Sequence, residues 1–96
     1  MRHFYLVTYD ICDEKRLHKV HKKMRGFGDH LQYSVFRCEL TDSNKVRMIA
    51  ALPDVINHNE DQVLIFNLGP ADGIRAGMVE ALGRKYTSSE HSAVVV

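Results

Sequence analysis

The stretch FYLVTYDI, residues 4–11, combines apolar, aromatic and β-branched residues and places a carboxylate, Asp10, close to its end. This composition predicts a buried strand over about residues 3–11. An acid at the carboxyl end of a strand lies where open sheets tend to bind ligands. An aspartate in that position also commonly caps the turn that follows. The sequence therefore makes Asp10 either a ligand-binding group or a local cap.

The segment that follows, residues 12–28, has the period of a helix. Cys12 or Asp13 can cap its start, and Gly26 or Gly28 can end it. Apolar residues recur at i, i+3, i+7 and i+10, which places them on one stripe that would face the core. The stripe consists of Leu17, Val20, Met24 and Phe27.

The next segment, DHLQYSVFRCEL at residues 29–40, is extended by composition. It forms either one long strand or two short strands folded as a hairpin near Tyr33 and Ser34. The periodicity favours neither arrangement over the other.

A second helix is expected over TDSNKVRMIAAL, residues 41–52. It opens with cap residues and carries Val46, Ile49 and Ala50 at helical spacing. Pro53 should end or kink it.

The rest of the chain contributes one more strand and a tail. QVLIFNL, residues 62–68, reads as a strand and is followed by turn residues. Residues 74–84 fit either a short helix or a short strand, and residues 92–96 resemble a strand. The element order predicts one α+β domain over residues 1–96, a ferredoxin-like βαββαβ sandwich with its core at about 1–70. Residues 71–96 would form a C-terminal strand extension.

Two of the expected strands are apolar on both faces, which normally means that both faces are covered. In residues 62–68, Val63 and Ile65 alternate with Leu64 and Phe66. Two helices can cover only one face of the sheet. A second copy packed sheet to sheet in a two-fold homodimer would cover the other. The alternative is that the C-terminal third folds back over the open face.

Composition bears on the cellular location of the protein and on its distribution of charge. No run of about 18 apolar residues occurs and the first residues do not resemble a signal peptide, so we expect no membrane association. Two cysteines are too few for a disulfide scaffold, which favours a cytoplasmic location. The net charge of +1 conceals a balance of +4 in residues 1–48 and −3 in residues 49–96.

Much of this positive charge lies in the first helix. Residues 15–25 contain six Lys or Arg, two His and no acid. This cluster is either a solvated basic face or a surface that contacts nucleic-acid phosphates. The candidate contacts are Lys15, Arg16, Lys19, Lys22 and Lys23.

Other candidate sites are weaker. One carboxylate alone cannot bind Mg²⁺, which takes six oxygen ligands, so Asp10 would need substrate, water or a second copy of itself. His18 and His21 follow Cys12, but neither CxxC nor HxxxH accompanies them, so a zinc site is not favoured. Thr8 and Ser34 have no acid or histidine at a spacing typical of a nucleophile.

Four segments, taken together, resemble a known family. YLVTYDI, KRLHKVHKKM, LQYSVFRCEL and QVLIFNLG occur in one order and spacing over about residues 3–70. They resemble the small CRISPR-associated protein of the spacer-acquisition complex, the "Cas two" family of CRISPR-associated endonucleases. The tail after residue 69 is similar to family members with a longer C-terminus.

The resemblance implies a homodimer to which the C-terminal extension, residues 71–96, contributes. It also implies a divalent-metal site, for Mg²⁺ or another cation such as Mn²⁺, at Asp10. It implies a metal-dependent endonuclease acting on RNA or DNA. It also implies a central dimer that bridges CRISPR-associated integrase dimers and binds duplex prespacer DNA in spacer acquisition. The family's basic residues fall on Arg16 and its neighbours. Arg37 stands where the family commonly has an acid, and would add positive charge near the hairpin.

Two other readings stay open. One is a toxin-like endoribonuclease of the same fold that acts alone on mRNA. The other is a ferredoxin-like binding module without catalysis, which the basic helix argues against.

Overall fold

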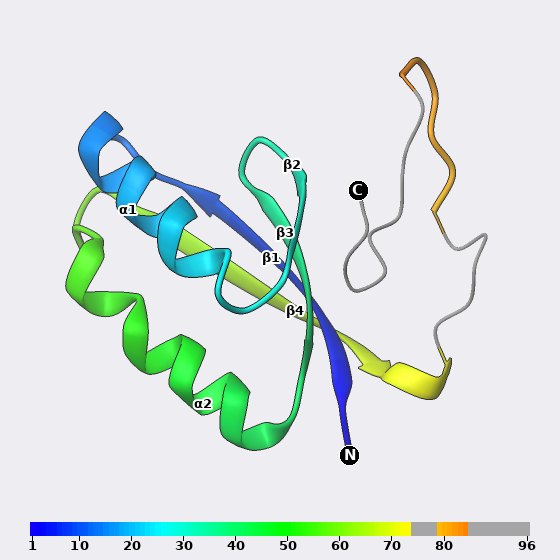
Figure 1. Cartoon of the computed structure of the whole chain (residues 1–96). Helices are drawn as coiled ribbons and strands as arrows, with labels where there is room; N and C mark the ends of the chain where they lie inside the picture. Colours follow the sequence, from blue (N-terminus) through cyan, green and yellow to red (C-terminus); the bar gives the residue numbers. More distant parts are fainter. Residues whose placement is uncertain (74–78, 85–96) are drawn as a thin grey trace.

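The computed structural model describes residues 1–73 and 79–84 (Figure 1). Within these residues there are four strands and two α-helices. In order they are β1 (His3–Asp10), α1 (Glu14–Met24), β2 (Asp29–Gln32), β3 (Val35–Leu40), α2 (Asp42–Ala51) and β4 (Gln62–Pro70). Short 3₁₀ helices, Pro53–Val55 and Ala71–Gly73, follow α2 and β4.

The strands form one antiparallel sheet in the order β2-β3-β1-β4. The first strand lies in the middle of the sheet, where Val7 faces Phe36 of β3 on one side and Ile65 of β4 on the other. This order and the two crossover helices confirm the predicted ferredoxin-like fold.

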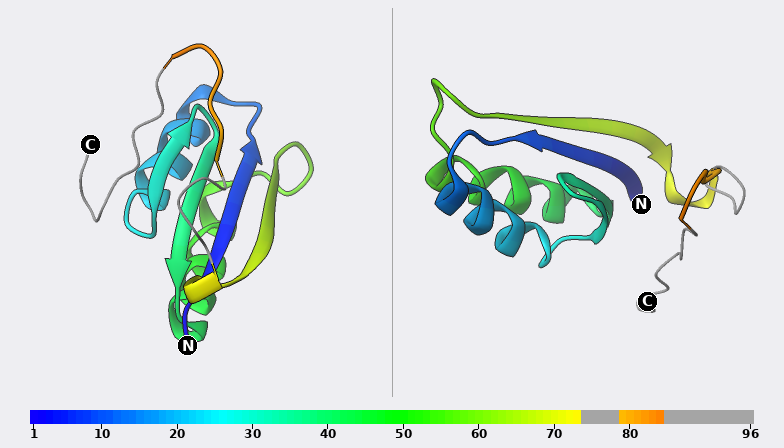
Figure 2. Two further views of the ribbon diagram at one scale, coloured as in Figure 1. Left: turned by 90° about the vertical axis from the view of Figure 1, so that its right-hand side faces the viewer. Right: turned by 90° about the horizontal axis from the view of Figure 1, so that it is seen from above.

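Both helices pack on the same face of the sheet (Figure 2). The core between the helices and the sheet consists of one face of β1, the inner residues of β3, two residues of α1, one residue of α2 and the residue that caps the end of α2. Its buried residues are Tyr5, Val7, Tyr9, Val20, Met24, Phe36, Cys38, Leu40, Met48 and Leu52. Burial raises the pKa of the Cys38 thiol to about 12, so this thiol is neutral and acts as an apolar group.

Helix α1 forms as its periodicity predicts. Asp13 is the N-cap, and its carboxylate accepts a hydrogen bond of 2.9 Å from the Arg16 amide. Val20 and Met24 are fully buried, and the flanking stripe residues, Leu17 and Phe27, pack against the core.

Glycine is required at position 28 for close packing, in addition to ending the helix. A Cβ at this position would collide with the carbonyl oxygen of Arg37 and with Sγ of Cys38. The chain can therefore pass from α1 into β2 against the backbone of β3 only where a side chain is absent.

The extended segment after α1 is a hairpin. Its two strands are joined at Tyr33 and Ser34, and their pairing shifts register between His30 and Gln32. The structure thus decides between the two arrangements that the sequence left open.

Helix α2 begins after Thr41, whose hydroxyl accepts a hydrogen bond from the Asn44 amide, and gives way to the 3₁₀ turn that starts at Pro53. Its core contact differs from the spacing noted in the sequence. The buried positions are Met48 and Leu52, the residue directly after α2. Val46 and Ile49 are 66% and 44% exposed. Those two residues lie on the outer side of the helix.

The other face of the sheet, called the open face below, is covered by no helix or strand of the described residues. Leu64, Phe66 and Leu68 of β4 are 43–47% exposed, and neither a helix nor a strand of residues 1–73 covers them (Figure 2). In the described part of the tail, residues 79–84 form neither a helix nor a strand, and their side chains are exposed. The predicted strand at 92–96 and the remainder of the segment 74–84 lie outside the described residues.

No helix in the described ranges is long and apolar enough to span a bilayer.

Candidate nucleic-acid interface

Asp10 lies at an exposed end of the central strand. It is the last residue of β1 and pairs in register with Gln62, the first residue of β4. One residue earlier, the Tyr9 amide donates a 3.1 Å hydrogen bond to the Ser34 carbonyl in the β2–β3 turn. The Asp10 carboxylate is therefore presented where β1, the start of β4 and the hairpin turn meet.

The two acids closest to Asp10 along the chain and across the sheet have other partners. Asp13 caps α1. Asp61, which precedes the residue that pairs with Asp10, accepts hydrogen bonds from the amides of Cys12 and Asn57 at 2.9 and 2.7 Å. Asp10 itself takes part in none of the side-chain hydrogen bonds or ion pairs found in the described ranges. Its carboxylate is thus available to a ligand.

These residues fit only one kind of metal site. Within residues 1–73 and 79–84, no three His, Cys, Asp or Glu side chains come together as a metal-binding group. Cys12 is engaged elsewhere, since its thiol donates to the Glu60 carbonyl at 2.9 Å. Mg²⁺ often binds to one or two carboxylates and completes its six ligands with water and substrate phosphate. Asp10 suits that type of site, completed by substrate or by a second copy of the chain.

Arg16 is bound to acids of the same chain. Its guanidinium contacts Asp61 at 2.8 Å and Glu60 at 3.0 Å. The Asp61 side chain is 0% exposed, and the hydrogen bond from Arg16 is the main reason that its pKa lies well below the ordinary range of a carboxyl group. The predicted phosphate ligand Arg16 therefore holds the β1–α1 connection to the loop before β4. Its charge is largely offset there.

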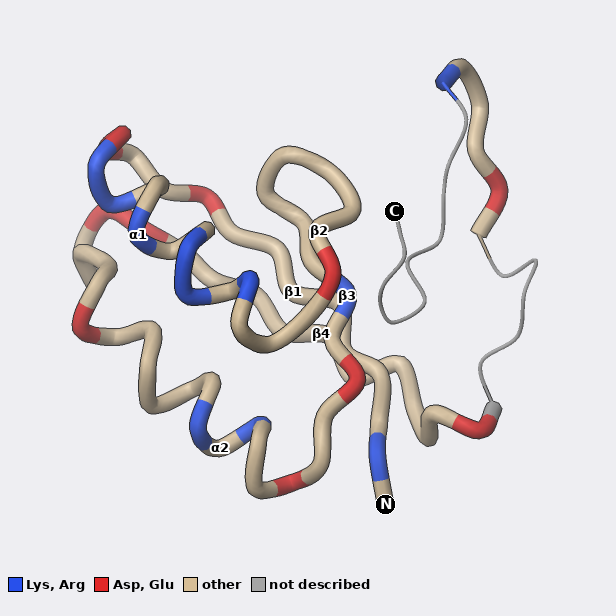
Figure 3. Tube along the Cα trace, viewed as in Figure 1, with Lys and Arg blue, Asp and Glu red and all other residues tan. Residues whose placement is uncertain are grey.

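The remaining basic residues of α1 are exposed. Figure 3 shows basic positions following α1 along its length. In the part of the chain that the structure describes, none of these lysines forms an ion pair with an acid. They are Lys15, Lys19, Lys22 and Lys23. This leaves four cations available to phosphates.

Arg37 lies apart from this helix. It pairs with Leu6 across β3 and β1, and its guanidinium lies 5.4 Å from the ring centre of Phe4. Its other contact is Asp29 of the hairpin at 3.8 Å. Arg37 thus belongs to the open face of the sheet, while the lysines belong to the helical side.

The sequence reading missed Asp61 and Glu60, the partners of Arg16. The one signal available was the acidic pair itself, which directly precedes β4. Strand β4 pairs with β1, and β1 ends just before α1. The sequence reading also gave no functional role to His30 and Tyr33, which the hairpin brings beside α1.

Comparison with known proteins adds family relationships. The family model for CRISPR associated protein Cas2 matches residues 1–72. A protein of Geobacter sulfurreducens named CRISPR-associated endoribonuclease Cas2 is 41% identical over the full length of both chains. A Rhodospirillum rubrum protein named CRISPR-associated endoribonuclease Cas2 1 is 38% identical, covering 98% of this chain and 91% of its own. The crystal structure of Streptococcus pyogenes Cas2 matches with a TM-score of 0.71 at 33% identity, over 83% of this chain and 99% of that one.

Proposed function

This chain belongs to the CRISPR-associated protein Cas2 family, and we propose that it is a divalent-metal-dependent endoribonuclease that works as a two-fold dimer. The observation that carries the proposal is the placement of Asp10. An exposed carboxylate without a partner among the described residues stands at the end of the central strand. Substrate can reach it there.

Only a few groups would take part in the reaction. A divalent cation, Mg²⁺ or Mn²⁺, would offset charge on the scissile phosphate and make a water molecule a better nucleophile. Asp10 would hold that cation at the strand end. Lys15 and Lys19 would bind flanking phosphates, while Asp13 and Asp61 maintain the local structure. With so few groups to move protons, we expect a slow enzyme.

The open face of the sheet supports the dimer. Leu64, Phe66 and Leu68 expose a row of apolar side chains along β4, and Phe4 and Leu6 of β1 are only partly covered. Exposed apolar patches of this kind mark interaction surfaces. A second copy packed face to face would cover the row and would bring a second Asp10 into the assembly.

The lysines of α1 favour a second function for the same dimer. Unpaired cations spread along one helix suit the backbone of duplex DNA, whose phosphates are contacted without regard to sequence. The dimer would then bridge CRISPR-associated integrase dimers, with prespacer DNA lying across it. This role requires no cleavage and can coexist with it.

The test compares Asp10→Asn with Glu39→Gln on single-stranded RNA, with Mg²⁺, with Mn²⁺ and with a chelator. Glu39 is an exposed acid that pairs with Phe4, near the opposite end of β1. We expect cleavage by the wild type and by Glu39→Gln only with metal, and none by Asp10→Asn. Titration with Mn²⁺ followed by electron paramagnetic resonance should show binding lost in Asp10→Asn alone. Equal cleavage by all three proteins would refute the assignment of Asp10.

A further inference from the structure

A groove of about 640 Å³ lies between α1 and the β2–β3 hairpin, and of the groups proposed to act in cleavage only Lys15 and Lys19 line it. Its volume falls within the range of about 300–1,000 Å³ that small-molecule sites occupy. Asp10 is not among its lining residues. Ser34, next to the lining residue Tyr33, accepts the hydrogen bond of the Tyr9 amide, so the hairpin turn beside the groove is joined to the residue that precedes Asp10.

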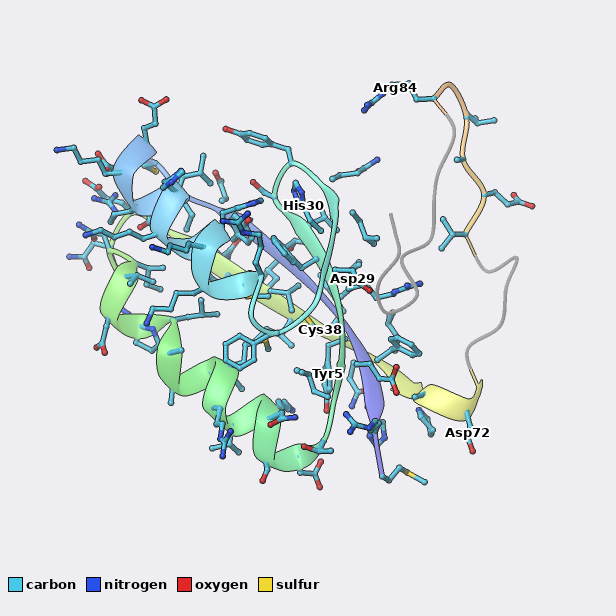
Figure 4. The ribbon with its side chains drawn as sticks, viewed as in Figure 1. Tyr5, Asp29, His30, Cys38, Asp72 and Arg84 are labelled. Carbon is cyan, nitrogen blue, oxygen red and sulfur yellow. The ribbon has the colours of Figure 1, made fainter. Side chains whose placement is uncertain are left out.

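One wall of the groove consists of rings. Tyr33 at the hairpin turn is 77% exposed although it is a large aromatic residue. The His30 ring lies 4.6 Å from that of His21, edge to face, and 5.0 Å from that of Phe36. Figure 4 shows His30 on the hairpin. Exposed aromatic rings beside a basic surface are the means by which proteins stack unpaired bases.

The hairpin turn is held in shape. Nε2 of His30 lies 3.2 Å from the Tyr33 carbonyl oxygen, within hydrogen-bonding distance. Because His30 also packs on Phe36, a buried residue of β3, this contact fixes the turn relative to the core. A ligand that stacks on Tyr33 would therefore meet a preorganised surface, which lowers the entropic cost of binding.

The opposite wall supplies cations and an apolar floor. Lys15 and Lys19 come from the outer side of α1, and Leu17 lies between them in the sequence. Among the described residues that line the groove, Glu14 is the one acid, and it is adjacent to Lys15. His21 takes part as a ring, because burial and the neighbouring His30, Arg25 and His18 lower its pKa and favour the neutral form. A ligand with an aromatic ring and an anionic group matches these two walls.

We propose that this groove binds one nucleoside monophosphate unit, with its base against Tyr33 and His30 and its phosphate at Lys15 and Lys19. The unit can be a free nucleotide or the unpaired end of a single strand. Binding does not depend on cleavage, so the proposal stands apart from the assignment of Asp10.

The first experiment measures binding of AMP by calorimetry, with chelator present to prevent cleavage. Replacing a stacking aromatic residue by Ala costs about 1–3 kcal/mol, so Tyr33→Ala should weaken AMP binding between about 5- and 150-fold. Tyr33→Phe should retain most of the affinity. Lys19→Gln should weaken binding, whereas Lys22→Gln, on the same helix but outside the groove, should bind as the wild type does. Amide NMR spectra of each variant verify the fold.

Ligand fragments test which chemistry is recognised. We expect ribose 5-phosphate, which lacks the base, and adenosine, which lacks the phosphate, each to bind more weakly than AMP. Ribose 5-phosphate binding as tightly as AMP, or a Tyr33→Ala variant that binds AMP like the wild type, would overturn the proposal. A wild-type protein that binds no AMP at a concentration of about 10 mM would overturn the proposal as well.

A competition experiment separates the two sources of the unit. A fluorescent single-stranded octamer, bound in chelator, is titrated with AMP. Displacement that depends on Tyr33 would assign the groove to a strand end, whereas AMP binding without displacement would assign it to a free nucleotide. Either result supports a nucleotide groove.

Discussion

Arg16 and Asp61, 45 residues apart in the sequence, form an ion pair of 2.8 Å in which the carboxylate is completely covered. The pair joins the start of α1 to the loop that leads into β4. Together with the amides of Cys12 and Asn57, it surrounds Asp61 with donors. It therefore fixes the segment that directly follows Asp10.

Removal of this acid should destabilise the fold. Asp61→Ala removes the acceptor of two backbone amides and leaves the Arg16 guanidinium with the exposed Glu60 alone, so we expect the Tm to fall by at least about 5 °C. Glu60→Gln is the matched control, because Glu60 contacts the same arginine from a largely exposed position. Its Tm should change by less than about 2 °C. Calorimetry compares the three proteins, and equal melting of Asp61→Ala and the wild type would refute the structural role.

The ion pair should also have a pH signature. Because the pKa of Asp61 is lower in the folded chain than in the unfolded one, its contribution is fully present above about pH 4, the ordinary carboxyl range. It is lost progressively as the pH falls below that range. The Tm difference between the wild type and Asp61→Ala should therefore be constant between pH 5 and pH 7 and shrink towards pH 2. A difference that grows on acidification would contradict this assignment.

The open face of the sheet predicts the oligomeric state. Light scattering should give twice the 11.0 kDa mass of one chain for the wild type. Phe66→Asp places a charge within the apolar row and should shift the mass towards the monomer. Ile49→Asp is the control, since Ile49 on α2 is 44% exposed, close to the 46% of Phe66, but lies on the helical side. A monomeric wild type, or dissociation by both variants, would argue against dimerisation through the sheet.

The lysines of α1 predict how DNA binding depends on salt. Each lost phosphate contact should reduce the slope of log affinity against log salt by about 0.9 for duplex DNA. Changing Lys15, Lys19 and Lys23 together to Gln should thus flatten the slope by up to about 2.7 per protomer. Arg16→Gln should leave the slope nearly unchanged and lower the Tm instead, because its guanidinium is already bound to acids. A triple variant with the wild-type slope, alone and with integrase present, would make this helix an ordinary solvated face.

His21 predicts a second, milder pH dependence. Burial lowers its pKa in the folded chain, and the charges of His30, Arg25 and His18 lower the pKa further. The unfolded chain therefore binds more protons as the pH falls below about 6.5, and folding stability decreases there. We expect the Tm to fall between pH 7.5 and pH 5.5, and to fall less in His21→Phe, which keeps a ring against Phe36. His58→Gln, at an exposed loop position, should follow the wild type.

The sequence predicted those parts of the fold that depend on local patterns. The α1 stripe and its Asp13 cap follow from residues within one or two turns of each other. The ferredoxin-like fold followed from the order of the elements along the chain. Helix α2 was harder, because Val46 and Ile49 have the same spacing as a core stripe, while Met48 and Leu52 are the residues turned towards the sheet. Only the position of the helix on the sheet decides between the two sets.

The candidate site was less predictable, since its contacts join distant segments. Arg16 resembles its basic neighbours in the sequence, and its separate role depends on an acid 45 residues away. The groove could not be anticipated either. It exists only because the hairpin turn brings Tyr33 and His30 beside α1, and the pattern of residues 29–40 did not require a hairpin.

The central place of β1 has a consequence for synthesis of the chain. His3–Asp10 is the first strand to leave the ribosome, yet one of its two neighbours, Gln62–Pro70, is the last of the four. Until Pro70 has emerged, the nascent chain carries an apolar strand with one edge unpaired, and such edges invite aggregation. The nascent protein is therefore most vulnerable during translation of residues 11–70, when a chaperone that shields the β1 edge would matter most.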